Sequence, residues 1–319
     1  MLTIHIGMPK TGTTACQRTL SAAAPALARM GFEYPSGFRN TEGIAHHAIA
    51  GELVSRRDLK GPEIEGFLAY LAGNSAGNVI ISSEAFTNAL GPSNLATFLE
   101  FIDACRARTL TRLVISLRRI DSFMESMYLH SVKVGETRID LADYVAARWL
   151  WTMSLFRGLA IVRTRVGTAE MVVIKYEATE AFVGRFFDAI GLPFRHEPEF
   201  FSVPRENIRL GLKAHTILRH LDHFTDLIAT PADRRELVRG FEKGDLQFEQ
   251  DAYSYRLLSF EDADRFHSQG IEGSRQTGVR EYEEFFGAER VTACNHTTLD
   301  PSNVNASDLL KLKAFLQQH

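Results

Sequence analysis

The stretch that most constrains this chain begins at its second residue. Residues 2–6 form an apolar run with β-branched side chains, which favours a strand, and residues 15–20 favour a helix through their Ala, Gln, Arg and Leu. Between them lies a loop that contains Gly7 and Gly12. A glycine-rich turn at a helix start directs backbone N–H groups and the positive end of the helix dipole toward one place. The sequence therefore predicts a strand, a phosphate-binding loop and a helix.

This loop differs from the ordinary nucleoside-triphosphate loop, G-x-x-x-x-G-K-[ST]. Gly7 and Gly12 keep its glycine spacing, but Thr13 follows the second glycine and the lysine lies inside the loop, at Lys10. A lysine after the second glycine reaches the terminal phosphates of a nucleotide, whereas one inside the loop meets a transferred group from another direction. The alternative is a Gly-Thr turn between a buried strand and a helix, with no ligand.

A second informative stretch follows the apolar run at 111–117, which we expect to be a strand. Arg118 stands at its carboxyl end, and Ser126 and Tyr128 lie about two helical turns further on. Arginine offers a planar fork of N–H groups to a phosphate, and a serine hydroxyl adds one hydrogen bond. The alternative for this stretch is an ordinary ion pair of Arg119 with Asp121 at a helix entry, worth less than about 1 kcal/mol.

Both stretches resemble motifs of the sulfotransferase family. Residues 9–14, Pro-Lys-Thr-Gly-Thr-Thr, are similar to its 5′-phosphosulfate loop, which usually reads Pro-Lys-[Ser/Thr]-Gly-Thr-[Thr/Ser]. Residues 118–128 are similar to its 3′-phosphate motif, Arg-x-Pro-x-Asp-x-x-x-Ser-x-Tyr, although Ile120 replaces the proline and Asp121 stands one residue early. The Leu-Arg-Arg-x-Asp form resembles a bacterial branch. The resemblance covers about the first two thirds of the chain.

The resemblance implies a donor, 3′-phosphoadenosine-5′-phosphosulfate (PAPS), a product, adenosine 3′,5′-bisphosphate (PAP), and no metal. Lys10 would stabilise charge on the leaving bridging oxygen. Arg275, in a late stretch that resembles the family's basic loop, would add a cationic contact to the donor, unless it lies on a solvated helix face. The residues implied to bind the donor are Pro9, Lys10, Thr11, Gly12, Thr13 and Thr14 at the 5′ end, Arg118 and Ser126 at the 3′-phosphate, and Arg275.

Glu84 is the first candidate for the general base. It follows an apolar run that begins at Asn78, and ligands of open parallel sheets bind beyond the carboxyl ends of strands. The Ser-Ser-Glu sequence resembles the branch of the family that uses a glutamate; the alternative is a carboxylate that caps the next helix. His46 and His47 are rival candidates for the general base, because histidine titrates near neutral pH. The alternative is that both are solvated histidines of a loop.

The order of apolar runs and amphipathic stretches predicts an α/β fold. We expect a P-loop-like three-layer arrangement, in which helices flank a mostly parallel sheet of about four or five strands, with a helical C-terminal portion. The expected division is a PAPS-binding core at 1–193 and a helical portion at 194–319 that packs on it, together forming one structural domain. Two helices are expected at 140–151 and 154–166.

Composition limits the partners and the compartment. A net charge of -3 argues against a general nucleic-acid binder, and the three cysteines form neither a metal pattern nor a disulfide framework. No signal sequence and no apolar stretch of about 20 residues is evident, so a cytoplasmic protein without a membrane span is expected. The acceptor would be a hydroxyl or amine of a saccharide or small metabolite. Oligomeric state stays open. The alternatives are a kinase or other nucleotide enzyme and a non-catalytic nucleotide-binding relative.

Overall fold

The protein is described by a computed structural model, which covers residues 1–39, 41, 43–74, 77–176, 181–192, 210–224, 231–248, 251, 255–291 and 296–318. The chain forms two compact units whose segments interleave along the sequence. The first unit comprises Met1–Arg119, Trp149–Glu206 and Gln269–Ala288, and the second comprises Ile120–Arg148, Asn207–Ser268 and Glu289–His319. The expected boundary at 193–194 lies outside the described residues, and the expectation of one structural domain made of a core and a helical portion stays a prediction.

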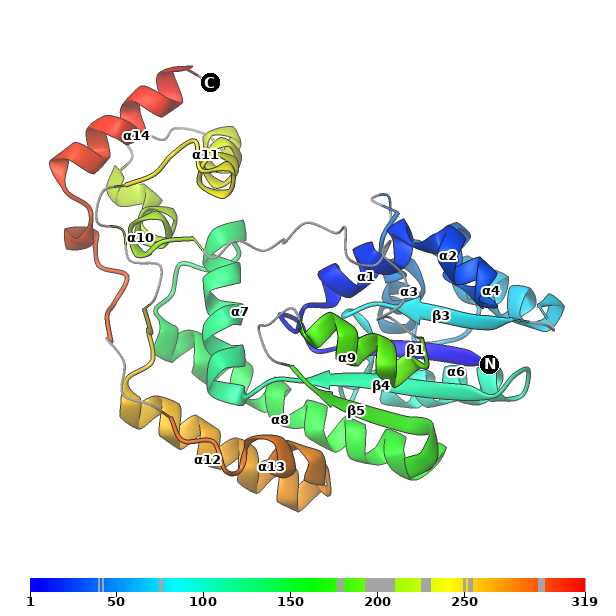
Figure 1. Cartoon of the computed structure of the whole chain (residues 1–319). Coiled ribbons are helices and arrows are strands. Elements are labelled where there is room, and N and C mark those ends of the chain that lie inside the picture. Colours follow the sequence, from blue (N-terminus) through cyan, green and yellow to red (C-terminus); the bar gives the residue numbers. More distant parts are fainter. Residues whose placement is uncertain are drawn as a thin grey trace. The chain divides into compact units, whose positions relative to one another are not determined.

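The first unit is built on a five-stranded sheet in the order β2-β3-β1-β4-β5, and every pair of neighbours is parallel (Figure 1). This confirms the predicted α/β class. β1 is central, with His5 in register with Ser82 of β3 and with Val114 of β4. The strands are β1 (Leu2–Gly7), β2 (Phe32–Glu33), β3 (Asn78–Ser82), β4 (Thr111–Leu117) and β5 (Met171–Lys175).

Helices cover both faces of this sheet (Figure 1). On one face, a buried cluster joins α1, α2 and α9 to Ile80, Val114 and Ile174 of the strands. The helices that follow β2 and β3 lie on the other face, where α6 contacts both β4 and α4. The helices named here are α1 (Thr13–Ala22), α2 (Ala24–Arg29), α3 (His47–Ser55), α4 (Pro62–Gly73), α5 (Phe86–Ala89), α6 (Leu95–Arg106) and α9 (Ala181–Ile190).

The neighbouring strands β1 and β3 send the chain to opposite faces. The chain leaves β1 for α1, and it leaves β3 for α5 and α6 on the other side. Such a reversal separates the two loops at the carboxyl ends of the strands, which is where open parallel sheets bind ligands. The fold therefore places the glycine loop and the residues after Ser82 at the carboxyl edge of the sheet.

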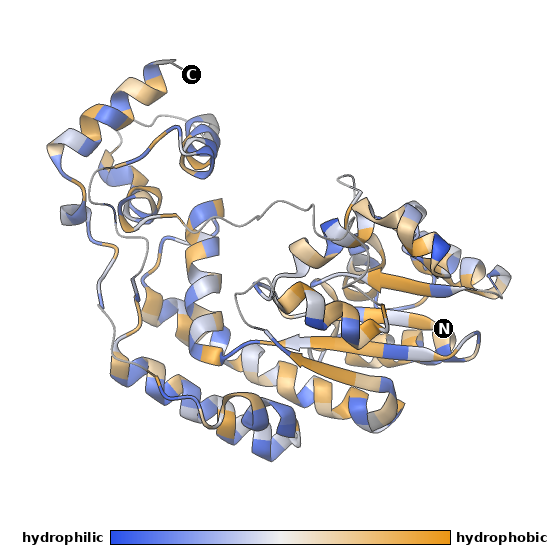
Figure 2. Ribbon diagram, viewed as in Figure 1, coloured by the Kyte–Doolittle hydropathy of each residue, from blue (hydrophilic) through white to orange (hydrophobic). Residues whose placement is uncertain are grey.

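The strands are largely hydrophobic and the helices around them are two-sided (Figure 2). This pattern follows from burial on both faces, which parallel sheets require. A few strand residues are polar and buried, among them His5 of the central strand, which is fully buried.

The second unit is helical and has its own apolar core. Its central ion pairs join α7 (Ile120–Val134) to a later segment: Arg256 Nη2 lies 3.0 Å from Asp121 Oδ2, and Arg256 Nε lies 2.6 Å from Glu125 Oε2. Asp121, considered above as a partner of Arg119, thus binds Arg256. The other elements that lie wholly in this unit are α10 (Leu212–Arg219), η5 (Leu221–Phe224), α11 (Pro231–Lys243), η6 (Pro301–Asn303) and α14 (Ala306–Gln318).

Two longer helices contribute residues to both units, and α13 (Arg280–Phe286) follows the second of them. α8 (Leu141–Val166) is one helix, so the prediction of two helices at 140–151 and 154–166 is wrong. The segment between has no Gly or Pro, and Ser154 Oγ donates to Trp151 O within the helix. α12 (Phe260–Thr277) ends before Gly278, whose φ is 76°.

The continuous α8 also bears on the expected absence of a membrane span. By length and composition it is sufficiently apolar to cross a membrane, and 39% of its most apolar window is buried. Core helices of water-soluble proteins pass the same test of length and composition, so one such helix is weak evidence for a membrane span. The expectation that no stretch is long and apolar enough is corrected for this helix.

Candidate functional site

The loop between β1 and α1 has an unusual backbone. Lys10 and Gly12 have positive φ values of 63° and 69°, whereas Thr11 between them does not. Alternation of this kind turns successive N–H groups toward one side and forms an anion-binding concavity. The Thr11 hydroxyl donates to Met8 O at 2.6 Å, and Met8 N donates to Ser116 O at 3.3 Å, which ties the loop to β4.

Gly7 and Gly12 are required here for steric reasons. A Cβ at Gly7 would overlap the methyl group of Thr13. A Cβ at Gly12 would lie 3.1 Å from the Phe182 ring and 3.2 Å from the Tyr176 ring, in a backbone conformation that already disfavours side chains. Gly12 also directly precedes the first turn of α1, so the N–H groups of the loop lie next to the N–H groups at the start of the helix.

Arg118 lies against this loop. Its Nη1 donates to Lys10 O at 2.7 Å, and its guanidinium stands over the Tyr176 ring, 5.3 Å from the centroid. Tyr176 in turn packs edge-on against Phe182, with centroids 5.0 Å apart. The structure therefore brings together the two sequence motifs, Lys10 from the first and Arg118 from the second.

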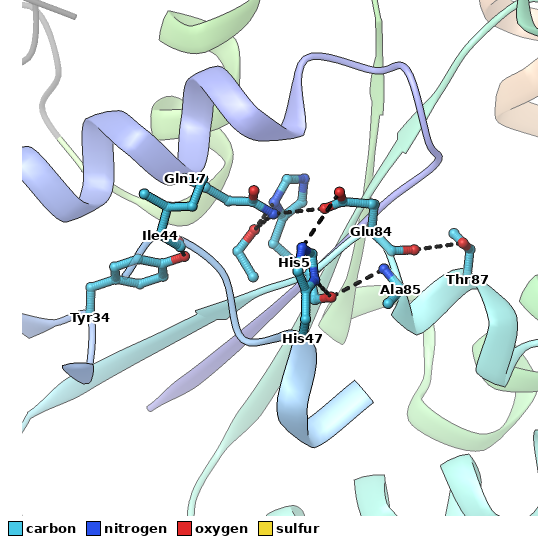
Figure 3. A network of polar contacts seen from close by, with 10 residues as sticks. His5, Gln17, Tyr34, Ile44, His47, Glu84, Ala85 and Thr87 are labelled. Atoms are coloured by element: carbon cyan, nitrogen blue, oxygen red, sulfur yellow. Dashed lines mark hydrogen bonds and ion pairs between the residues drawn. The ribbon is translucent and has the colours of Figure 1, made fainter. Parts of the chain in front are cut away.

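The carboxylate of Glu84 is held from two elements (Figure 3). Gln17 Nε2, on α1, donates to Glu84 Oε2 at 3.0 Å, and His47 Nε2, on α3, lies 3.7 Å from Glu84 Oε1. The Glu84 side chain is 30% exposed, so its carboxylate is fixed and still reachable by a ligand. This geometry suits a group that accepts a proton.

His47 is itself fixed by the strand end. Its Nδ1 lies 2.7 Å from Ser83 Oγ, and the same oxygen accepts a hydrogen bond from Ala85 N at 3.1 Å. Which of Nδ1 and Ser83 Oγ donates depends on the tautomer of His47; in the tautomer whose Nδ1 accepts, Nε2 carries the proton and faces Glu84. His47 thus supports the carboxylate.

His46 has a different environment from its neighbour. It is buried; its Nε2 lies 3.1 Å from Pro35 O, and its Nδ1 accepts from Ser82 N at 3.2 Å. Burial lowers its pKa to about 3. Both ring nitrogens are occupied by the backbone, so His46 joins the segment before α3 to β3 and is unsuited to proton transfer.

His5 continues the polar contacts beneath Glu84. Its Nδ1 lies 2.8 Å from Ser82 Oγ, which also accepts from Gln17 Nε2 at 3.3 Å, and its Nε2 lies 3.3 Å from Ser116 Oγ. Burial lowers the pKa of His5 to about 3, so the ring is neutral at ordinary pH. A buried chain of polar groups therefore runs from β4 through β1 and β3 to Gln17.

Ser126, Arg275 and the other loop residues were also predicted to bind the donor. Ser126 is half-buried on α7 of the second unit. Arg275 is exposed on α12, where its Nε and Nη2 donate to Glu283 Oε1 at 3.0 and 2.6 Å. Within the loop, Thr11 and Thr13 are buried, whereas Pro9 and Thr14 are half-buried.

Among the described residues, no three of His, Cys, Asp and Glu gather in a way that could hold a metal ion. Cys16 and Cys105 are buried free thiols whose pKa is raised by burial, and Cys294 lies outside the described residues.

Sequence reasoning missed four residues of this region: His5, Gln17, Tyr176 and Phe182. A histidine inside an apolar strand is a signal that was available for His5. Gln17 lies on α1 one turn after Thr13, the first residue of the helix, and only the placement of α1 beside β3 gives it a partner.

The fold and the site define an α/β protein with an all-parallel sheet and a glycine loop at its first strand–helix junction. Comparison with models of protein families and with curated proteins found no match. A solved structure, the sulfotransferase domain from the curacin biosynthetic pathway, is similar at a TM-score of 0.34 and 11% identity, over 65% of this chain and 78% of that one. At this distance the likeness transfers no function.

Proposed function

We propose that the chain is a sulfotransferase that moves a sulfuryl group from PAPS to a hydroxyl or amine. The observation that carries the proposal is the hydrogen bond of 2.7 Å from Arg118 Nη1 to Lys10 O. It joins a phosphate-type loop to an arginine at the carboxyl end of the adjacent strand. PAPS has phosphate groups at two positions of one nucleoside, and a loop and an arginine side by side suit such a donor.

The proposed reaction forms one bond to sulfur and breaks another. The acceptor oxygen or nitrogen attacks the sulfur, and the bond from sulfur to the bridging oxygen of the 5′-phosphate breaks. The electron pair leaves with that oxygen, so PAP is the second product. The acceptor's proton passes to the Glu84 carboxylate and then to solvent.

The residues divide this work between binding and proton transfer. The loop from Pro9 to Thr14 would bind the 5′-phosphosulfate, and Lys10 would stabilise charge that develops on the leaving oxygen. Arg118 would bind the 3′-phosphate. The sequence motif also assigns Ser126 to the 3′-phosphate, and this role stays a prediction. Glu84 is favoured over His46 as base because its carboxylate is partly exposed and fixed by Gln17.

Two alternatives use the same loop. A kinase or another enzyme of nucleoside triphosphates would need a cation near the terminal phosphate, and Thr13 stands where the usual lysine does. A nucleotide-binding protein without turnover would need only the loop and Arg118. The acceptor class, a saccharide or small metabolite, is part of the proposal.

Calorimetric titration tests the donor directly. Wild-type protein is titrated with PAP and, separately, with ATP and magnesium, and each titration is repeated with Arg118→Ala. The proposal expects PAP to bind much more tightly than ATP and the variant to lose about tenfold or more of the PAP affinity. Binding of ATP alone would overturn the sulfotransferase proposal in favour of the kinase.

A further inference from the structure

Arg118 donates its hydrogen bond to the backbone of the loop and not to a side chain. Nη1 donates to the carbonyl oxygen of Lys10, 108 positions earlier in the chain, and the bond is partly buried. Lys10 has a φ of 63°, one of two positive values among the described residues other than glycine. A residue with a Cβ adopts this conformation only where its surroundings hold it there.

Two hydrogen bonds hold the backbone of Lys10 in this conformation. The Thr11 hydroxyl fixes Met8 O on the amino side of Lys10, and Arg118 fixes Lys10 O itself. A hydrogen bond from a charged donor is stronger than one between neutral groups. Arg118 is therefore the stronger of these two supports.

The position of Arg118 is in turn set by β5. Tyr176 N donates to Leu117 O at 2.7 Å, which continues the pairing of β5 with β4 and places the Tyr176 ring beside the guanidinium. The same ring and Phe182 pack where a Cβ of Gly12 would lie. Arg118, Tyr176 and the loop thus form one packed group.

We infer that Arg118 is a positioning residue for Lys10: it holds the left-handed backbone of the phosphate loop and thereby couples the 3′-phosphate end of the donor site to the 5′ end. The inference rests on the proposed function for the identity of the donor. A guanidinium has five N–H donors, so one group can bind both Lys10 O and a phosphate. Loss of Arg118 then weakens binding at the 5′ end even for a nucleotide that has no 3′-phosphate.

Adenosine 5′-monophosphate (AMP) separates this role from a simple phosphate clamp. Affinities for AMP and PAP are measured by calorimetry for wild type, Arg118→Ala and the control Arg112→Ala, whose residue lies near the amino end of β4, away from the loop. We expect Arg118→Ala to lose about tenfold in AMP affinity and the control to bind like wild type.

Hydrogen exchange of the ligand-free proteins gives a second readout. Peptides that cover residues 8–16 should exchange about tenfold faster in Arg118→Ala than in wild type or Arg112→Ala, because the loop opens more often. Both changes are required. If either AMP affinity or loop exchange is unchanged while PAP affinity falls, the inference is overturned and the proposed function stands. If wild type binds no PAP, the proposed function itself fails.

Discussion

Gln17 donates a hydrogen bond from Nε2 to Oε2 of Glu84 over 3.0 Å, across 67 positions of sequence. Gln17 is buried on α1, the helix that begins at the glycine loop, and Glu84 follows β3. The donor loop and the proposed base are therefore connected by one helix and one hydrogen bond. This link gives a physical basis for predictions that separate donor binding from proton transfer.

Replacement of the base tests proton transfer. In Glu84→Gln the side chain keeps its shape and loses its capacity to accept a proton, so we expect the transfer rate to fall about a hundredfold or more. PAP affinity should stay within about twofold, since Glu84 is assigned no donor contact. The rate is measured as PAP formation from PAPS with a panel of sugars, phenols and amines as acceptors.

The matched control for this variant is Glu65→Gln, which changes an exposed glutamate on α4. It should keep the wild-type rate. A Glu84→Gln protein that turns over as fast as the control would remove Glu84 from the mechanism and leave His47 as the candidate base.

Replacement of Gln17 tests the positioning of Glu84. Gln17→Leu keeps the volume and removes the donor, so the carboxylate loses a fixed partner and the transfer rate should fall about tenfold. Gln17→Glu places a second carboxylate beside Glu84 and should lower the rate further. Both variants should keep PAP affinity. Equal losses of rate and of PAP affinity would instead indicate that α1 has moved.

Much of the fold could be predicted from the sequence because its strands are apolar runs with clear ends. β1, β3 and β4 occur where the apolar runs at 2–6, from Asn78 and at 111–117 predict them. β2 was missed, since two residues carry no periodic signal. The continuous α8 was missed because Thr152-Met153-Ser154 lowers the apolar periodicity without a true helix breaker.

The site was predictable only where the chain itself brings groups together. Lys10 and Gly12 lie in one loop, and parallel strands place Arg118 and Glu84 at the same edge, so their proximity follows from topology. The contacts of Gln17 with Glu84, and of Tyr176 and Phe182 with Gly12, join segments that come together only in the tertiary structure. The same limit hid the difference between His46 and His47, which are neighbours in sequence with unlike surroundings.

A side chain at Gly12 should damage the loop. Gly12→Ala places a Cβ against Phe182 and Tyr176 at a φ of 69°, so we expect a loss of about 1–2 kcal/mol in unfolding free energy and at least tenfold in PAP affinity. Gly51→Ala on α3 is the control, because nothing lies within 4 Å of its added Cβ. In a helix this change should stabilise by about 0.5–1 kcal/mol. Urea unfolding and calorimetry measure the two effects.

Arg275 tests whether the late basic stretch contacts the donor. Its guanidinium binds Glu283, and this hydrogen bond lowers the pKa of the Glu283 carboxyl. Because Glu283 holds this guanidinium on an exposed helix, Arg275→Ala should change PAP affinity by no more than about twofold. A tenfold loss in the same calorimetric titration would show that Arg275 leaves Glu283 for the donor, as the resemblance to the family implies.

The buried histidines predict a dependence of stability on pH. Burial lowers the pKa of His5 and of His46 to about 3, whereas an unfolded histidine titrates at about 6.5. Between these values the unfolded chain binds more protons than the folded one, so the stability present above pH 6.5 is lost as pH falls toward 3. Each histidine contributes a slope of about 1.4 kcal/mol per pH unit in this window.

Variants of His46 make this slope measurable. Urea unfolding at several values between pH 6.5 and pH 5 should show that the unfolding free energy of His46→Gln falls less steeply than that of wild type, by about 0.7 kcal/mol per pH unit at pH 6.5 and about 1.4 at pH 5. The variant should also be less stable at pH 7, because Pro35 O and Ser82 N lose their partner, so the slope and not the absolute value is compared. Gly51→Ala changes no titrating group and should keep the wild-type slope. Parallel curves for His46→Gln and wild type would show that His46 gains a proton in the folded protein, against the burial and the two backbone hydrogen bonds found for it.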